Sequence, residues 1–382
     1  MFKNYFHTAI KVLLKHRVYS LINIVGLTLG LCACMVVATV VIDDLSYDKQ
    51  WSRSNDLYRV VTVNKMGEGL YDRFPSSLAG LAPELKKSYP EVESYGRLAI
   101  NDALTLKIDD KASNVIKATS LLADTSVWSM LDFKIIGGNP KNYIDGSTNL
   151  VISESFRDKY FAGQNPVGRI IHDVPAYGDK PGNYLITGII KDIPSNTHLR
   201  ADVIQLQKNR IEALQKEGYG SFTQNYLLMR PGTDIRKFQD KINTWYKRFI
   251  GKDKYYQFEF QPLKDVYLHS DFASSSYQPV KGSVQNIYIF SGVALLLLII
   301  ACVNFINLST ARATTRLRET GVRKILGAKR SHIVFQFLAE AILFFTVSSI
   351  LAIIFYQLSL NPVQSFLGHT LSETFTSHLS LL

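Results

Sequence analysis

The chain has 382 residues, 47% of them hydrophobic, and a formal net charge of +11. This length allows more than one domain, and the hydrophobic share becomes unusual only when its distribution along the chain is considered. Residues 1–42 and 282–382 each carry a net charge of +4 beside long apolar stretches, so the basic charge indicates membrane topology and argues against nucleic acid binding.

Residues 1–17 place apolar side chains at near-helical spacing with cations between them. An interfacial cytoplasmic helix and a simple basic anchor explain this pattern equally well. Residues 18–42 carry no charge and exceed the roughly 20 residues that span a bilayer, which predicts a first transmembrane helix rather than a cleaved signal peptide. Gly26 and Gly30 form a GxxxG motif inside it, which predicts close packing against either a second copy or another span of this chain.

Residues 43–284 mix strand-like and helix-like patterns, which predicts an α+β domain outside the cytoplasm. Asp43, Asp44 and Asp48 open this segment, and we expect a solvated face at the membrane exit rather than a cation site. The expected strands are 57–63, 104–108, 115–119, 150–153, 168–171, 184–190 and 255–261, and the expected helices are 76–88, 153–161 and 234–250.

The C-terminal part predicts two further spans, residues 285–311 and 333–359, joined by a cytoplasmic loop at 312–332 and followed by an extracytoplasmic tail at 360–382. Glu340 lies about two turns into the third span, where a carboxylate is costly unless it is paired or reaches the interface. Two interpretations remain open for Glu340, namely a side chain that snorkels to the interface and a contact that fixes the loop to the span.

The 312–332 loop contains Arg316, Glu319 and Arg323 at i, i+3 and i+7, so one face of a short helix can hold alternating charges. A helix fixed between two spans would transmit force to both. Composition alone favours an ordinary solvated loop that obeys the positive-inside rule.

A resemblance changes this balance. The stretch RLRETGVRKILGAKRSHIVFQFLAEAI, from Arg316 to Ile342, resembles the signature loop of the FtsX/MacB permeases, also called type VII ABC transporters. Their common form is R-x-R-E-I-G-[IV]-R-x-x-[LV]-G-A, followed by a helix with E-A. The N-terminal KNYFHTAIKVLLKHRVYSLINIVGLTLGL is similar to the start of that family's first span, most closely in the large permeases of Bacteroidetes. LVISESFRDKYFAGQNPVGRII and YLITGIIKDIPSNTHL are similar to its periplasmic core domain.

The resemblance implies that the spans act as a mechanical link, moved by a separate cytosolic ATPase dimer that consumes ATP. Glu340 matches a glutamate early in the family's following span, whereas Thr320 replaces a usually apolar residue. The residues expected to couple to the ATPase are Arg316, Arg318, Glu319, Gly321, Arg323, Lys324, Gly327 and Ala328.

The family's units have four spans, so the resemblance predicts that this chain is truncated within the 360–382 tail. The sequence has no G-x-x-x-x-G-K-[ST] loop and no metal-ligand spacing among its eight histidines. We therefore expect no enzymatic activity and no directly bound cofactor.

The function expected is that of an inner-membrane ABC transporter permease, N-terminus cytoplasmic, that exports a drug, peptide or lipoprotein. An FtsX-like regulator of a cell-envelope enzyme is the alternative, and a membrane-anchored sensor without an ATPase is disfavoured by the loop motif. The expected partners are the ATPase, membrane lipid, a second copy or second permease, and a periplasmic adaptor with an outer-membrane channel.

Overall fold

The computed structural model describes residues 17–65, 71–108, 115–162, 164–174, 182–208, 214, 220–251, 256–270, 272, 280–311, 321–322, 325 and 330–371. Its internal contacts divide the chain into two compact units. The helical unit combines Met1–Leu45 with Gln285–Leu382, and the outer domain is Ser46–Val284. The predicted interfacial helix at 1–17 lies outside the described residues, apart from Arg17.

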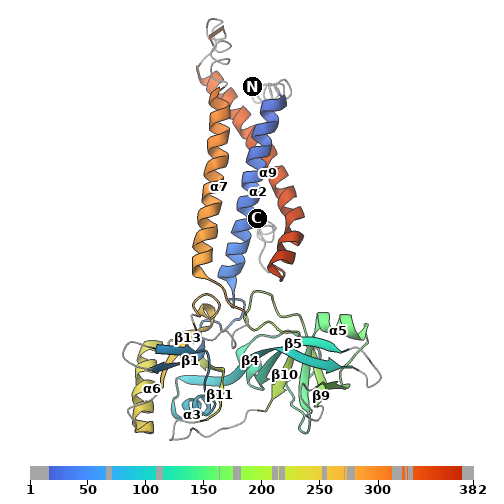
Figure 1. Cartoon of the computed structure of the whole chain (residues 1–382), viewed down its shortest axis with the longest axis vertical. Coiled ribbons are helices and arrows are strands. Elements are labelled where there is room, and N and C mark those ends of the chain that lie inside the picture. The colour runs from blue at the N-terminus through green and yellow to red at the C-terminus, as the bar shows by residue number, and fades with distance from the viewer. Residues whose placement is uncertain are drawn as a thin grey trace. The chain divides into compact units, whose positions relative to one another are not determined.

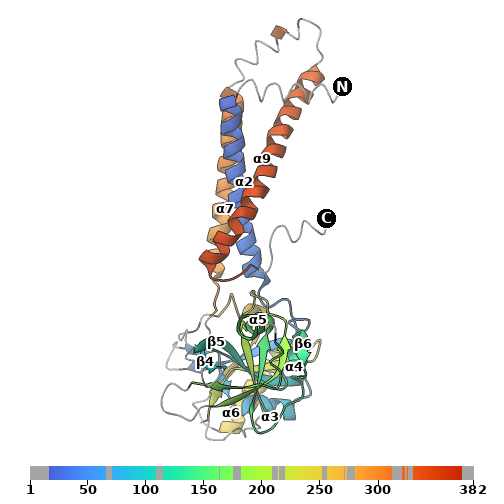
Figure 2. The same cartoon turned by 90° about the vertical axis from the view of Figure 1, so that its right-hand side faces the viewer.

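The helical unit contains α2 (Arg17–Ser46), α7 (Val284–Ala311) and α9 (Arg330–Leu367). All three are long and apolar enough to cross a membrane. In both views α2 and α7 run alongside each other, while α9 crosses them at an angle (Figures 1 and 2). The contacts described below show that α2 is antiparallel to α7 and parallel to α9. The start of α2, the end of α7 and the start of α9 therefore lie at the same end of the unit.

The third helix is longer than the predicted span. It continues from residue 359 to Leu367, through Pro362, so residues 360–367 are helical rather than part of a tail. The apolar pattern ends earlier than the helix does, because Asn361, Pro362 and Gln364 lower the hydropathy of its last two turns. The helix stops at Gly368, whose φ of 71° is the left-handed conformation that glycine adopts at helix ends.

The outer domain contains two lobes, and the first is a βαββαβ arrangement. Its strands follow the order β13-β1-β12-β4, with every neighbouring pair antiparallel, which is the ferredoxin-like topology. Its elements are β1 (Leu57–Lys65), α3 (Leu81–Ser88), the first part of β4 (Val92–Lys107), β12 (Asn225–Met229), α6 (Ile235–Ile250) and β13 (Gln257–Pro262) (Figure 1). Short strands β2 (Tyr71–Phe74), β3 (Ser77–Leu78) and β11 (Phe222–Thr223) flank it.

The first lobe packs α3 and α6 against one face of its sheet. Buried residues of α6 recur every four positions at Phe238, Ile242, Tyr246 and Ile250, as an amphipathic helix requires. Asp234 caps the start of α6 by accepting from two backbone N–H groups. The predicted helix at 76–88 begins only at Leu81, because Ser77–Leu78 pair with β11 as a strand.

The second lobe is inserted between β4 and β12. Its elements are β5 (Ile116–Asp124), α4 (Val127–Met130), β6 (Ile135–Gly138), β7 (Thr148–Ser153), α5 (Glu154–Phe161), β8 (Ile170–Asp173), β9 (Asn183–Ile190) and β10 (Val203–Gln207). The strand order is β4-β5-β10-β7-β9-β6, and β8 pairs with both β9 and β4. The pairing therefore returns to β4 and encloses a core that includes Leu106, Ile152 and Ile186.

Candidate functional site in the helical unit and the domain connectors

Two glycines bring α2 into contact with α7. A Cβ at Gly26 would lie 2.8 Å from Asn304 Nδ2, and a Cβ at Gly30 would lie 2.6 Å from Ala301 Cβ. Further along α2, the Cys34 thiol donates a hydrogen bond to the Ala294 carbonyl at 3.1 Å. The GxxxG motif thus packs against another span of the same chain, one of the two arrangements that its spacing allowed.

Hydroxyl groups join α2 to α9. Thr28 Oγ1 donates to the Ser348 carbonyl at 3.4 Å, and Ser348 Oγ donates to the Ile24 carbonyl at 3.3 Å. Nearer the other end, the Thr39 and Tyr356 hydroxyls are 2.8 Å apart, and both side chains are buried. Because lipid offers no hydrogen-bond partners, such interhelical contacts favour one register of α2 on α9.

The buried end of α9 carries an aromatic contact and a carboxylate. Phe344 meets Tyr19 edge-on at 6.2 Å between ring centroids and packs on Phe305 of α7 at 6.4 Å. Glu340 lies one turn earlier on α9 and is only 6% exposed. A carboxyl group buried at this depth in an apolar helix is costly unless it is compensated.

The coupling residues lie mostly beyond the described part of the chain. Gly321 is helical and exposed, with no atom within 4 Å of a Cβ built on it. Its neighbours Val322 and Ile325 are 56% and 88% exposed. Arg316, Arg318, Glu319, Arg323, Lys324, Gly327 and Ala328 fall outside the described residues, so their coupling role remains an expectation.

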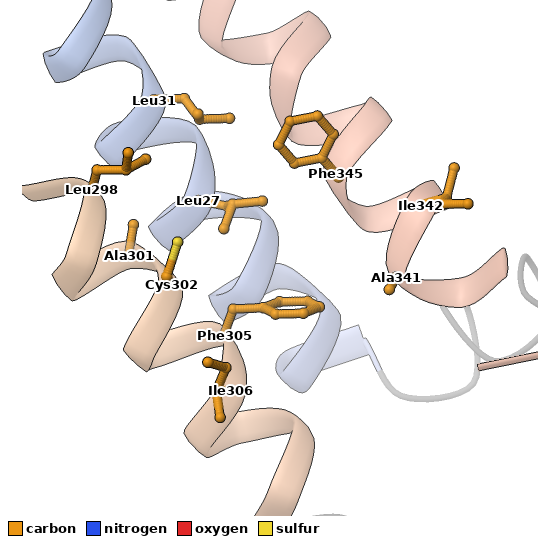
Figure 3. A pocket seen from close by; sticks show the side chains of 10 residues that line it. All are labelled: Leu27, Leu31, Leu298, Ala301, Cys302, Phe305, Ile306, Ala341, Ile342 and Phe345. Atoms are coloured by element: carbon orange, nitrogen blue, oxygen red, sulfur yellow. The ribbon is translucent and has the colours of Figure 1, made fainter. Parts of the chain in front are cut away.

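An apolar cavity of about 420 Å³ opens between the three helices. Figure 3 shows Leu27 and Leu31 from α2, Cys302 and Phe305 from α7, and Phe345 from α9 around it. Its ten lining residues are apolar apart from the Cys302 thiol, so it suits hydrocarbon rather than a polar solute. In the described part of the chain, no group of three His, Cys, Asp or Glu side chains could hold a metal ion.

Two of the three aspartates after the first span, Asp43 and Asp48, do not form the solvated face that was predicted, whereas Asp44 is partly exposed. Asp43 is 1% exposed and lies 3.3 Å from His369 Nε2, and Asp48 is fully buried. Both carboxylates find partners that are distant in sequence, which spacing along the chain cannot reveal.

The first domain connector, Ser46–Asp48, is fixed to the loop between β9 and β10. The Asp48 backbone N–H donates to the Asn196 carbonyl at 2.9 Å. The Asp48 carboxylate accepts from the Thr197 hydroxyl, from the His198 backbone N–H at 3.3 Å and from His198 Nδ1 at 2.7 Å. Four hydrogen bonds therefore hold the residue that lies two positions beyond α2.

The same histidine continues the network into the first lobe. His198 Nε2 lies 2.8 Å from the Tyr226 hydroxyl, which in turn accepts a hydrogen bond from the Arg59 side chain. Because the Asp48 carboxylate can only accept, His198 donates to it from Nδ1. Burial is the main cause that raises the pKa of Tyr226 to about 12, so its hydroxyl keeps its proton.

The second domain connector, Leu263–Ser283, meets the other end of this network. Arg59 is fully buried, and its guanidinium donates to Gln261 Oε1 and to Ser270 Oγ, both at 2.8 Å. The Tyr47 ring stacks on the Tyr267 ring with centroids 3.5 Å apart. The segments that follow α2 and precede α7 are thus joined within the outer domain.

Comparison with known proteins identifies this architecture. The family model described as MacB-like periplasmic core domain matches residues 20–245, more than half of the chain. The model described as FtsX-like permease C-terminal matches residues 291–379. The chain belongs to the FtsX/MacB permease family. The resemblance seen in its loop and core-domain motifs is confirmed, as is the predicted combination of membrane helices with a core domain of the MacB type.

The relatives of this FtsX/MacB permease are distant in sequence. The macrolide export ATP-binding/permease protein MacB of Neisseria gonorrhoeae is 22% identical over 365 residues, which cover 91% of this chain and 51% of that protein. The chain therefore spans about half the length of this curated relative. Among solved structures, a permease domain from Porphyromonas gingivalis is 18% identical with a TM-score of 0.46, covering 63% of this chain and 98% of that one. The periplasmic region of MacB from Actinobacillus actinomycetemcomitans is 12% identical with a TM-score of 0.37, and the match covers 56% of this chain and 92% of that one.

Sequence reasoning on this FtsX/MacB permease missed the buried network of Asp48, His198, Tyr226 and Arg59. Its four members lie in separate segments. Two signals were available: His198 lies near the end of the stretch YLITGIIKDIPSNTHL, which resembles the family's core domain, and Asp48 is the last of three aspartates beside a span.

Proposed function

We propose that this chain is the permease subunit of an ABC transporter in the inner membrane, with its N-terminus and the 312–332 loop in the cytoplasm and the outer domain on the other side. The direction of α7, antiparallel to both α2 and α9, supports this orientation, because it brings the starts of α2 and α9 to the same end as the end of α7. The cations of residues 1–17 and of the loop then flank one membrane surface, as cytoplasmic flanks do.

A separate cytosolic ATPase drives the cycle in this proposal. ATP is consumed by that partner, and this chain binds no cofactor itself. The observation that carries the proposal is the motif from Arg316 to Ile342, which continues directly into α9. Movement of the loop by the ATPase would shift α9 along its contacts with α2, and the spans would pass the displacement to the outer domain.

The proposed cargo is a drug, a peptide or a lipoprotein moved outward. The name of the gonococcal relative records macrolide export, and this supports export over regulation of a cell-envelope enzyme. A pair of permease chains, as a homodimer or with a second permease, would complete the membrane part. A periplasmic adaptor and an outer-membrane channel would complete the export route.

The test is co-purification from detergent with the ATPase encoded beside this chain. We expect Arg318→Glu with Arg323→Glu to abolish association and the permease-dependent ATP hydrolysis, because the charge that faces the ATPase is reversed. Lys117→Glu, on an exposed strand position of the outer domain, is the matched charge reversal and should leave both unchanged. Undiminished association of the double variant would remove the loop from this role.

Orientation is tested separately by labelling Ala328→Cys in a background where Cys32, Cys34 and Cys302 are replaced by alanine. A membrane-impermeant maleimide should label position 328 only after the inner membrane is opened. Labelling of intact spheroplasts would invert the topology and overturn the proposal.

A further inference from the structure

The residue that leaves α2 is held in an unfavourable backbone conformation. Asp48 has a φ of 58°, in the left-handed region that costs a non-glycine residue free energy and persists only where surrounding contacts enforce it. Those contacts come from Asn196, Thr197 and His198, all in one loop of the outer domain. The conformation of Asp48 is therefore enforced by contacts within the outer domain.

The segment that leads to α7 is held in the same way. Ser270 accepts from Arg59 and donates to the Val266 carbonyl, which closes the turn formed by this segment. The Gly282 backbone N–H donates to the Tyr267 carbonyl at 2.9 Å. A Cβ at Gly282 would overlap the Tyr267 ring, so the chain just before α7 is packed onto the ring that stacks on Tyr47.

We propose that Asp48, His198, Tyr226, Arg59 and Ser270 form a connector joint that fixes the two connectors to each other and to the first lobe, with Asp48 as its positioning residue. Displacement of α2 is then delivered to the outer domain together with α7, and not absorbed in a loose linker. The inference rests on the proposed permease function and names the part of the chain that carries its motion.

The chemistry of the joint supports a mechanical role. Asp48, Tyr226 and Arg59 are fully buried and His198 is 4% exposed, so no substrate reaches the Asp–His–Tyr series and acid–base catalysis is excluded. The negative charge of Asp48 acts on the Arg59 guanidinium. The hydrogen-bonded series through His198 and Tyr226 links these two buried groups, so a change at one end is felt at the other.

The test is hydrogen–deuterium exchange on the full-length chain in lipid nanodiscs. In Asp48→Asn, we expect exchange about tenfold faster or more at the backbone amides of Asp48 and His198, because a charged acceptor is lost. The Val266 and His269 amides of the second connector should accelerate with them, while β9 keeps its protection. Acceleration confined to the first connector would overturn the joint.

The reciprocal variant, Ser270→Ala, removes only a hydroxyl from the other end of the joint. It therefore tests the proposal even if the Asp48→Asn protein does not fold. It should accelerate exchange at Asp48 as well as at its own connector, and an unchanged Asp48 amide would contradict the proposal. Asp124→Asn is the matched control, because Asp124 is a similarly buried carboxylate whose ion-pair partner, Arg97, is not a member of the joint. It should leave the connector amides as they are. No ATPase enters these measurements, so a failed association with the ATPase would remove the proposed function and not the joint.

Discussion

Gly30 on α2 and Ala301 on α7 approach so closely that a Cβ at position 30 would lie 2.6 Å from the Ala301 Cβ. Real Cβ contacts are essentially never this short, and the obstacle is a methyl group fixed to a helix backbone. Neither side can yield by a rotamer change, so the two helices must separate to admit any side chain at position 30.

Exchanging these two residues gives a direct test of the helix contact. Gly30→Ala should destabilise the helical unit by roughly 1–3 kcal/mol, as overpacking does in tightly packed interiors. Adding Ala301→Gly should restore most of the loss, because the methyl group merely changes helix. Thermal unfolding in detergent measures both. Gly292→Ala on α7, where a Cβ meets nothing within 4 Å, should not destabilise, and failure of the exchange to recover stability would refute this contact.

A second prediction concerns Thr39 and Tyr356. Thr39 Oγ1 also lies 2.9 Å from the Met35 carbonyl of its own helix, to which it donates, so the Tyr356 hydroxyl donates to Thr39. A double-mutant cycle of Thr39→Val and Tyr356→Phe should give a coupling free energy of about 0.6 kcal/mol, typical of interhelical hydrogen bonds in membranes. A coupling indistinguishable from zero in denaturant unfolding would mean that packing alone holds α2 against α9.

The outer domain depends on a buried ion pair. Arg97 binds Asp124 through two guanidinium nitrogens and its backbone N–H, with Asp124 only 1% exposed. Asp124→Ala should cost roughly 3–5 kcal/mol in chemical unfolding, because it strands the Arg97 charge. Asp145 pairs with Lys208 where both side chains are exposed to solvent, so Asp145→Ala should hardly change the free energy of unfolding. Equal losses of stability in the two variants would contradict the prediction that the buried pair matters more than the exposed one.

Alkaline pH should destabilise the outer domain in a defined window. Burial raises the pKa of Tyr226 and of Tyr246 from 10.0 to about 12. Between these values the unfolded chain has lost both protons while the native chain keeps them, so the free energy of unfolding falls as pH rises from about 10 to about 12. Tyr246→Phe should make this decline shallower, as measured by chemical unfolding across that range. An unchanged slope would exclude Tyr246 as a contributor.

Elements with a clear periodicity were predicted from the sequence. The predicted strands 104–108 and 115–119 fall in β4 and β5, which pair antiparallel with Leu104 opposite Ala118. Helix α6 follows its predicted bounds, because its apolar stripe, its acidic N-cap and the glycine at its end all indicate the same helix. β12 was missed because both of its faces are buried: Leu227 enters the core beneath α3 and α6, and Tyr226 enters the core on the other face. A strand buried on both sides shows no alternation.

The candidate site was predictable only where it is local. The packing of Gly26 and Gly30 follows from their spacing, whereas the choice between a partner chain and another span depended on Asn304 and Ala301, some 270 residues away. The burial of Asp48 depends on His198 and Tyr226, which tertiary structure alone brings to it. The coupling role of the 312–332 residues stays a prediction, and the charge reversal at Arg318 and Arg323 tests it.

The second lobe leaves and rejoins the first through one pair of neighbouring backbone groups. The Leu98 N–H donates to the Gln224 carbonyl at 3.0 Å, and Arg97 pairs with Asn225 in the next rung. A segment whose two ends already touch can change in length without rethreading the scaffold around it. The second lobe can therefore vary in its other loops, whereas the loop that carries Asn196 and His198 is constrained by its hydrogen bonds to Asp48.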